Sequence, residues 1–300
     1  MALQEEVQDE PLTTEEKAAE EAKFFGKQDN QRARAVGWSS LGYFQRRLHK
    51  RINLVSATAE VLGDRTPKRG LTLGCGDMTG EYRLFNLCQI DHITAYDISE
   101  GQRDKFYDYV YNPELGIEVD YRIGDAANDD LGENEFDMVY IQQSYHHFEE
   151  VEKVAANIAR ALKPDGVFVL NDYIGPPFLQ RTEKQREVTR RIWKTLPKRF
   201  RKGPNGKIHD DILIPPIESL PPHEAIRSDA ILPALREHFD VIDEHQFAGL
   251  LFPLFNGFAQ NYDEKGVQPF IRSMWEMDEL LIEQGVIEPN FIRGLYRTKG

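Results

Sequence analysis

The sequence predicts an α/β fold built on a doubly wound, mainly parallel sheet, with a mainly helical cap. Short apolar runs alternate with helical patterns from about residue 70 to residue 173, and strict alternation of this kind gives parallel strands joined by right-handed crossovers. Glycines and polar side chains follow the ends of the apolar runs, where ligands bind in such sheets. The flanking segments lack the alternation, so we expect them to form the cap.

The elements of the core are expected in a fixed order along the chain. Strands are predicted at 70–74, 92–97, 118–123, 136–142 and 166–173, with helices near 79–88, 100–110 and 148–162. After residue 173 the alternation stops, and a helix is expected near 182–195. A helix at 228–238 and a sixth strand at 239–247 then return the chain to the sheet.

The chain divides into four segments by its pattern. We expect an N-terminal helical cap at 1–62, a cofactor-binding core at 63–174, a cap insertion at 175–227, and the end of the core at 228–300 with a helical insertion at about 250–285. Within the first segment, Thr13 and Glu16 form a capping box for a helix through about Phe25. An amphipathic helix is expected from about Gly37 through about Leu62. The segments 1–60 and 175–225 should pack over the carboxyl ends of the strands.

The most informative stretch is the run Leu71–Gly80, followed by Asp97 at the end of the next apolar run. Glycine lets the backbone approach a ligand where a Cβ would block it. A helix that begins after such a turn offers free N–H groups, and a carboxylate on the next strand can hold two ribose hydroxyls. The pattern predicts a nucleoside cofactor, which is either a nicotinamide dinucleotide or S-adenosyl-L-methionine.

Motifs further along the chain distinguish the two cofactors. Asp125 and Ala126 follow the third strand, Gln142 ends the fourth, and Leu162–Gly166 forms a turn before the fifth. In this order, from Leu71 to Asp172, the chain resembles the class I S-adenosyl-L-methionine-dependent methyltransferases that act on small molecules. The resemblance implies S-adenosyl-L-methionine as the cofactor. It also implies a seven-stranded, Rossmann-like sheet with an antiparallel last strand, for which 291–297 is the candidate.

The resemblance also implies which residues contact the cofactor. Gly74, Cys75 and Gly76 would pass under its methionine part. Asp97 would bind the ribose hydroxyls, Ile98 would lie against the adenine, and Asp125 would accept from the adenine amine. Ala126 would leave room for the ring, Gln142 would border the methionine end, and Tyr43 would cover the cofactor from the cap. Each position has a structural alternative. Asp97 suits a helix N-cap, Asp125 suits a turn, Gln142 suits a loop outside the site, and Tyr43 suits ordinary packing of the cap.

Two adjacent histidines follow the fourth strand, at the mouth where an acceptor should approach. Histidine has a pKa suited to removing a hydroxyl proton, so His146 and His147 are the candidate catalytic bases. The alternative is that one of them caps the next helix. We expect no metal here, because adjacent histidines do not easily converge on one ion. Candidate substrate contacts are Tyr173, Arg190 and Arg191.

Charge and composition narrow the class of protein. The net charge of −13 is uneven, because the segment from Arg181 to Lys207 carries +9 and the remainder −22. An acidic chain repels nucleic acid, whereas the basic segment suits an anionic acceptor or is a solvated helix face. No membrane span or signal pattern is expected. The two cysteines, Cys75 and Cys88, are not expected to pair, so we expect a cytoplasmic protein.

The expected function is methyl transfer from S-adenosyl-L-methionine to a small-molecule or saccharide acceptor, at a hydroxyl. Methylation of carbon or nitrogen in a small metabolite is the nearest alternative. A cofactor-binding protein without turnover is the alternative of another class. Assembly into an oligomer is left open.

Overall fold

The structure, a computed structural model, describes residues 20, 23–24, 41–64, 66–221, 223–262 and 265–300. Seven strands within these residues form one sheet in the order β3-β2-β1-β4-β5-β7-β6. The strands are β1 (Arg69–Leu73), β2 (His92–Asp97), β3 (Glu118–Ile123), β4 (Phe136–Gln142), β5 (Leu162–Tyr173), β6 (Phe239–Phe247) and β7 (Phe291–Thr298). Strand β7 is antiparallel to β5 and β6, and the other pairs are parallel. The predicted doubly wound sheet with an antiparallel last strand is therefore confirmed.

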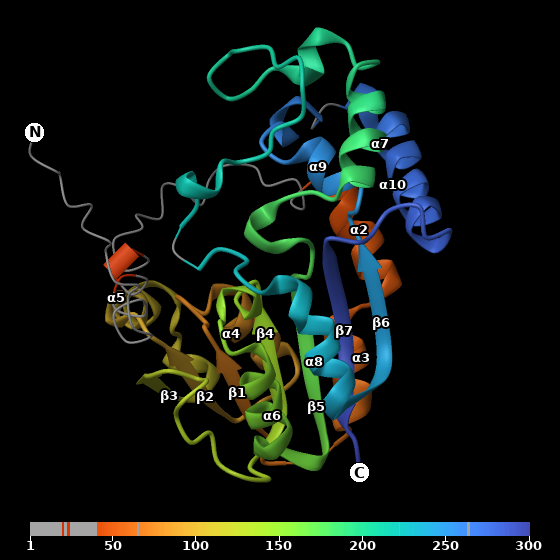
Figure 1. Cartoon of the computed structure of the whole chain (residues 1–300). Coiled ribbons are helices and arrows are strands. Elements are labelled where there is room, and N and C mark those ends of the chain that lie inside the picture. The colour runs from red at the N-terminus through yellow and green to blue at the C-terminus, as the bar shows by residue number, and fades with distance from the viewer. Residues whose placement is uncertain (1–19, 21–22, 25–40, 65, 222, 263–264) are drawn as a thin grey trace, which may run out of the picture.

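Helices cover both faces of this sheet (Figure 1). On one face lie α6 (Val151–Ala161) and α8 (Ile231–His238), which pack against each other. On the other lie α3 (Leu54–Leu62) and α4 (Thr79–Leu87). Because side chains alternate along a strand, β4 and β5 contribute to an apolar cluster on each face. The sheet is thus buried on both sides, as a parallel sheet must be.

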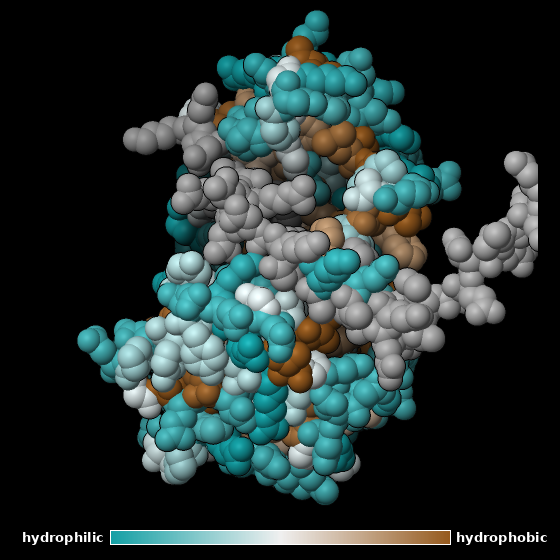
Figure 2. Space-filling model, turned by 90° about the vertical axis from the view of Figure 1, so that its left-hand side faces the viewer, coloured by the Kyte–Doolittle hydropathy of each residue, from teal (hydrophilic) through white to brown (hydrophobic). Residues whose placement is uncertain are grey.

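A cap of helices lies beyond the carboxyl ends of the parallel strands (Figure 1). Its helices are α2 (Gly42–Arg51), α7 (Glu183–Trp193), α9 (Leu251–Phe255) and α10 (Gln268–Glu283). They share a third apolar cluster, in which the Phe44 ring packs 5.4 Å from Phe255 and 5.8 Å from Trp275, measured between ring centroids. Seen from the side of α5 (Glu100–Lys105) and β3, hydrophobic side chains reach the surface where cap and core meet (Figure 2). A ligand held at the strand ends would be enclosed there.

Short helical turns connect these elements. They are 3-10 turns at Pro113–Leu115, Tyr145–His147, Pro177–Leu179, Lys198–Arg201, Ile217–Ser219, Ser228–Ala230, Ala259–Tyr262 and Lys265–Val267, and a π-helical turn at Phe106–Val110. The π-helical turn follows α5 directly, so the helix expected over 100–110 changes its hydrogen-bonding pattern halfway. None of the helices in the described part of the chain has the length and apolar character needed to cross a bilayer.

The helix expected to run from Gly37 through Leu62 is two helices where it is described. Ile52 is extended, and the Asn53 side chain accepts a hydrogen bond from Ser56 N at 3.3 Å. Asparagine is a strong N-cap, so it ends α2 and starts α3. Helix α3 packs against β5 and β7, so this part of segment 1–62 covers a sheet face and does not lie over the strand ends. The helix expected after Thr13 lies outside the described residues.

Two further boundaries differ from expectation near the fourth and fifth strands. Helix α6 begins at Val151 and not at Phe148, because Phe148 is extended after a 3-10 turn. Strand β5 begins at Leu162, where it pairs with Phe136 across an irregularity in β4. The first difference lies at the carboxyl end of β4, which carries the polar residues described next, and the second lies at the opposite ends of β4 and β5.

Candidate functional site

The turn after β1 has the conformation that its glycines predict. Gly74 has φ +61° and Gly76 has φ +51°, a region that other residues rarely adopt. Gly74 N donates to Tyr96 O at 2.8 Å, which holds the turn against β2. An ideal Cβ on Gly74 would lie 2.9 Å from the Ser144 Cβ. Glycine is therefore required at this position both by conformation and by the close approach of the loop after β4.

Asp97, at the end of β2, is tied to this glycine turn. One carboxylate oxygen accepts from Gly76 N and the other from Ser99 N, each at 2.8 Å. Burial raises the pKa of Asp97, although these backbone donors oppose the rise. A carboxylate has about four acceptor sites on its two oxygens, so Asp97 remains able to accept from a ribose hydroxyl. Ile98, next in the chain, is half-buried.

Cys75 and Gln142 border the same turn. Cys75 is buried, and burial raises the pKa of its thiol well above the usual value. Gln142 accepts a hydrogen bond from the Tyr140 hydroxyl and packs against Gly80 at the start of α4. Glu81, in the first turn of α4, is also buried there, and burial raises its pKa to about 8. The structure thus brings Gln142 to the glycine turn.

Asp125 has a structural role in its own loop. Its carboxylate accepts from Ala127 N at 2.9 Å and from the Asn128 side chain at 2.7 Å. Ala126 is buried in the cluster on the α6 face. These bonds are those of a turn-forming aspartate. Contact between Asp125 and an adenine stays a prediction.

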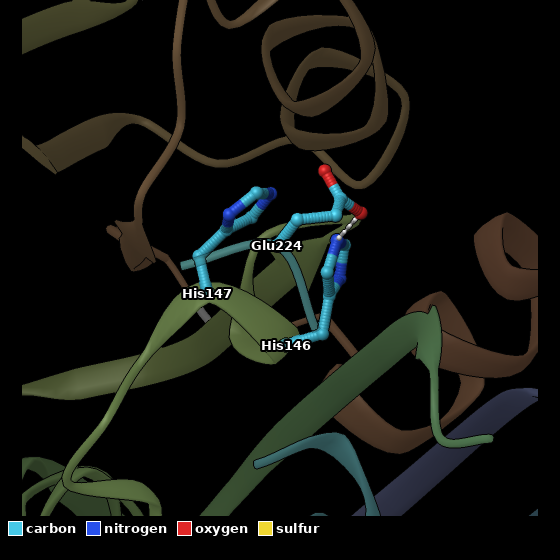
Figure 3. Close-up of side chains that lie close together, drawn as sticks. All are labelled: His146, His147 and Glu224. Atoms are coloured by element: carbon cyan, nitrogen blue, oxygen red, sulfur yellow. Dashed lines mark ion pairs between the residues drawn. The ribbon is translucent and has the colours of Figure 1, made fainter. Parts of the chain in front are cut away.

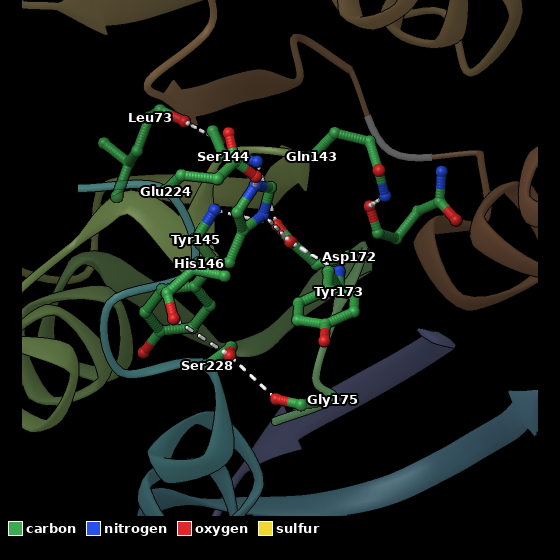
Figure 4. A network of polar contacts seen from close by, with 12 residues as sticks. Leu73, Gln143, Ser144, Tyr145, His146, Asp172, Tyr173, Gly175, Glu224 and Ser228 are labelled. Atoms are coloured by element: carbon green, nitrogen blue, oxygen red, sulfur yellow. Dashed lines mark hydrogen bonds and ion pairs between the residues drawn. The ribbon is translucent and has the colours of Figure 1, made fainter. Parts of the chain in front are cut away.

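The loop after β4 is held in place by Asp172 at the end of β5 (Figure 4). One Asp172 oxygen accepts from Ser144 N at 2.9 Å and from Tyr145 N at 2.7 Å. The other accepts from His146 Nδ1 at 2.5 Å and from Tyr173 N at 2.7 Å. Ser144 Oγ donates to Leu73 O at 2.8 Å, which fixes the loop against the end of β1. His146 is thereby set beside the glycine turn with one ring nitrogen committed to Asp172.

Glu224 completes a cluster that the sequence did not predict (Figure 3). Its carboxylate lies 3.5 Å from His146 Nε2, and one donor atom from each of Glu224, His146 and His147 lies within 4.8 Å of the others. The two imidazole centroids are 4.3 Å apart. The two adjacent histidines thus lie close together, although the sequence led us to expect that they would not converge on one ion. We call His146, His147 and Glu224 the histidine–glutamate cluster.

No sequence motif marks Glu224. It lies in the cap, between His223 and Ala225, which have φ of +60° and +54°. Such angles are uncommon in residues with a Cβ and tend to occur at functional sites. Ala225 is buried in the cap cluster, and its carbonyl accepts from Phe178 N at 2.9 Å. Contacts distant in sequence thus place Glu224, so only the structure could identify it.

The pKa values of the two histidines are shifted in opposite directions. Burial opposes the charge of His146, but the Asp172 and Glu224 carboxylates outweigh it and raise its pKa to about 10. Burial and the neighbouring charge of His146 lower the pKa of His147 to about 3. Near neutral pH the pair therefore carries one charge, located between two carboxylates, and one neutral ring.

Tyr173 and Tyr43 take structural positions. Tyr173 is buried, its hydroxyl donates to Pro176 O at 2.8 Å, and its ring lies 6.1 Å from that of His146. It supports the cluster, with its hydroxyl used by the backbone. Tyr43 packs against the cap cluster, with the Arg272 guanidinium 5.9 Å above its ring. A contact of Tyr43 with the cofactor stays a prediction.

The basic segment makes ion pairs within the cap. Arg190 pairs with both carboxylate oxygens of Asp211, each 2.9 Å from Nε. Arg191 is exposed and lies 4.0 Å from Glu187. Both lie in α7, on an open groove that also contains Glu183 and Glu187. These contacts join the basic residues to nearby acids of the cap.

The sequence is similar to known methyltransferases in its core. Residues 71–170 match a family described as a methyltransferase domain. The chain is 28% identical over 141 residues to 27-O-demethylrifamycin SV methyltransferase of Amycolatopsis mediterranei, covering 47% of this chain and 52% of that protein. It is 30% identical over 106 residues to sterol 24-C-methyltransferase ERG6 of Saccharomyces cerevisiae, covering 35% of this chain and 27% of that protein. The chain therefore spans about half or less of the length of these relatives.

A solved structure shares the fold over nearly the whole chain. It is geranyl diphosphate C-methyltransferase from Streptomyces coelicolor A3(2), with a TM-score of 0.51. The match covers 96% of this chain and all of that one, at 11% sequence identity. At this identity the likeness concerns the fold alone.

Proposed function

Because residues 71–170 form a methyltransferase domain of the class I S-adenosyl-L-methionine-dependent family, we propose that this chain transfers the methyl group of that cofactor to a hydroxyl of a small-molecule or saccharide acceptor. The cofactor supplies a methyl group already activated on a sulfonium. The protein then has to align the acceptor, exclude water and take up a proton.

The observation that carries the proposal is the place of the histidine–glutamate cluster beside the glycine turn. Ser144 joins the loop of the two histidines to the end of β1, next to Gly74. In the proposed reaction the acceptor oxygen forms a bond to the methyl carbon, and the carbon–sulfur bond breaks with its electron pair left on sulfur. The hydroxyl proton passes to a group at the cluster. Acids and bases of this kind contribute about 100-fold to 10,000-fold in rate.

The acceptor proposal does not follow from the relatives. The rifamycin enzyme is named for a substrate methylated on oxygen, and the sterol enzyme for methylation of carbon. Methylation of carbon or nitrogen remains the alternative within the family. What favours oxygen here is that the neutral His147 ring and the Glu224 carboxylate, which can accept a hydroxyl proton, lie at the strand ends.

Product analysis tests the proposal directly. Purified protein, methyl-labelled cofactor and fractionated cell extract should give S-adenosyl-L-homocysteine together with one labelled small molecule. Base treatment and mass fragmentation then show whether the label is on oxygen, nitrogen or carbon. We expect His147→Ala to lower the rate about 100-fold or more, because it removes a group of the cluster. The control is His49→Ala, at an exposed histidine of α2. Cofactor binding without product in any fraction would support a binding protein without turnover.

The charge of the acceptor is tested by changing Arg190 and Arg191 to Gln together. If the basic segment binds an anionic acceptor, the acceptor KM should rise and its salt dependence should flatten. We expect instead an unchanged KM and a slightly lower melting temperature, because Arg190 is already paired with Asp211. Exposed ion pairs of this type contribute about 1 kcal/mol or less each. A several-fold rise in KM at low salt would contradict this and would support an anionic acceptor.

A further inference from the structure

The histidine–glutamate cluster joins the core to the cap through groups that are typical metal ligands. His146 and His147 come from the 3-10 turn after β4, and Glu224 comes from the cap. Two imidazoles and a carboxylate are a ligand set found in zinc sites that keep one position open. Figure 3 shows the three side chains pointing toward one another.

The distances fit one small ion. Bonds from zinc to nitrogen or oxygen are about 2.0–2.2 Å, so two ligand atoms of a tetrahedral ion lie about 3.3–3.5 Å apart. The distance from His146 Nε2 to the Glu224 oxygen is 3.5 Å. The largest separation within the cluster is at most 4.8 Å.

Asp172 supplies the second requirement of such a site. A metal-binding histidine almost always donates its other ring nitrogen to a carboxylate, a carbonyl or water, which fixes the tautomer and the ring plane. Asp172 accepts from His146 Nδ1 and is itself held by Ser144 N and Tyr145 N. This leaves Nε2 directed at Glu224. The Tyr173 ring, at 73° to that of His146, supports the same orientation.

Charge also favours a dication. The Asp172 side chain is fully buried and that of Glu224 is 16% exposed, so two carboxylates lie close together away from water. A divalent ion would balance both, and buried charges are stable only when they are compensated.

We propose that His146, His147 and Glu224 bind a single Zn²⁺ ion, with Asp172 orienting His146. The fourth position would take the acceptor oxygen. This role of the fourth position rests on the proposed function, whereas binding of the ion does not. Coordination lowers the pKa of a bound hydroxyl. In this form of the reaction the ion would favour loss of the acceptor's hydroxyl proton to water, and the oxygen would form its bond to the methyl carbon as the carbon–sulfur bond breaks with its electron pair left on sulfur.

Calorimetric titration tests the ion site. Untagged full-length protein is stripped with a chelator, dialysed, and titrated with Zn²⁺. We expect one ion per chain, with Glu224→Gln and His147→Ala each weakening the affinity at least about 10-fold. His49→Ala, at an exposed histidine outside the cluster, should bind as the unchanged protein does. Co²⁺ in place of Zn²⁺ should give the visible absorption of a four-coordinate ion, which Glu224→Gln should lose. Folding of each variant is checked by circular dichroism, and Glu224→Gln is nearly isosteric.

The outcomes separate this inference from the proposed function. No bound Zn²⁺, or the same affinity in Glu224→Gln, overturns the ion site. Full methyl transfer by chelated protein overturns the role of the open position and leaves the proposed function standing. Specific Zn²⁺ binding by a protein that forms no methylated product supports the ion site and counts against the proposed function. Activity that is lost on chelation and restored by Zn²⁺ supports both.

Discussion

Replacing Asp172 with Ala is expected to destabilise the protein by about 3 kcal/mol or more and to abolish methyl transfer. The carboxylate is fully buried and accepts from two backbone N–H groups of the 143–147 loop, at Ser144 and Tyr145. Leaving a buried donor without an acceptor costs about 1–3 kcal/mol, and the truncated side chain leaves these two and Tyr173 N. It also leaves the His146 ring without the partner of Nδ1.

Asp172→Asn makes the test informative even if the alanine variant does not fold. The amide has one acceptor oxygen in place of two, so it can serve the backbone donors or His146 but not both. We expect a smaller loss of stability with a large loss of activity.

Urea unfolding gives the free energy of unfolding, and initial rates give activity. Asp240→Ala, at an exposed position of β6, is the matched control. A change in stability below about 0.5 kcal/mol for Asp172→Ala, the range of ordinary surface substitutions, would contradict the role given to this carboxylate.

The sheet could be predicted from the sequence because its signals are local. The runs at 92–97, 118–123, 136–142 and 239–247 are strands with these same bounds in the structure. The first three are continuous or alternating apolar runs that end at a polar residue, glycine or turn, and a strand requires little more. The run at 239–247 is less apolar, and all but its two ends are exposed or half-buried. The glycine turn is equally local, since positive φ at Gly74 and Gly76 follows from the residue type.

The cap and the acidic member of the histidine–glutamate cluster depend on contacts between residues far apart in the sequence. Arg47 of α2 illustrates this. Its guanidinium lies 2.6 Å from Glu276 and 3.6 Å from Glu279, both in α10. Glu224 likewise meets His146 only because the cap folds back onto the strand ends. Local patterns do not report such pairings, so the sequence predicted the histidines but not their acidic partner.

The break between α2 and α3 shows a different limit. The amphipathic pattern continues through residues 37–62, and Asn53 interrupts it without being a proline or a glycine. Its side chain satisfies Ser56 N and starts a new helix, which allows the chain to turn from the cap to the sheet face. At Asn53 the side chain caps a new helix, and the preceding helix does not continue through it.

Replacing Asp97 with Ala should weaken cofactor binding by about 1–3 kcal/mol, which is about 5-fold to 150-fold in Kd. Two effects act in the same direction. The ribose loses a charged acceptor, and the glycine turn loses the bond from Gly76 N to the carboxylate. Because both effects arise at one side chain, we expect a loss in the upper part of this range. Calorimetry with S-adenosyl-L-homocysteine measures it, with Asp108→Ala, at an exposed position after α5, as the control.

A change in the ligand separates the two effects. A 2′-deoxy analogue of S-adenosyl-L-homocysteine lacks one hydroxyl that Asp97 is expected to bind, but it still meets the glycine turn. If the carboxylate holds the ribose, the analogue should bind the unchanged protein more weakly than the parent ligand does, and Asp97→Ala should bind the two equally, since coupled groups are not additive. If Asp97 only shapes the turn, the penalty for the missing hydroxyl should be the same in both proteins. Tight binding of NADPH without affinity for S-adenosyl-L-methionine would contradict the assignment of the cofactor itself.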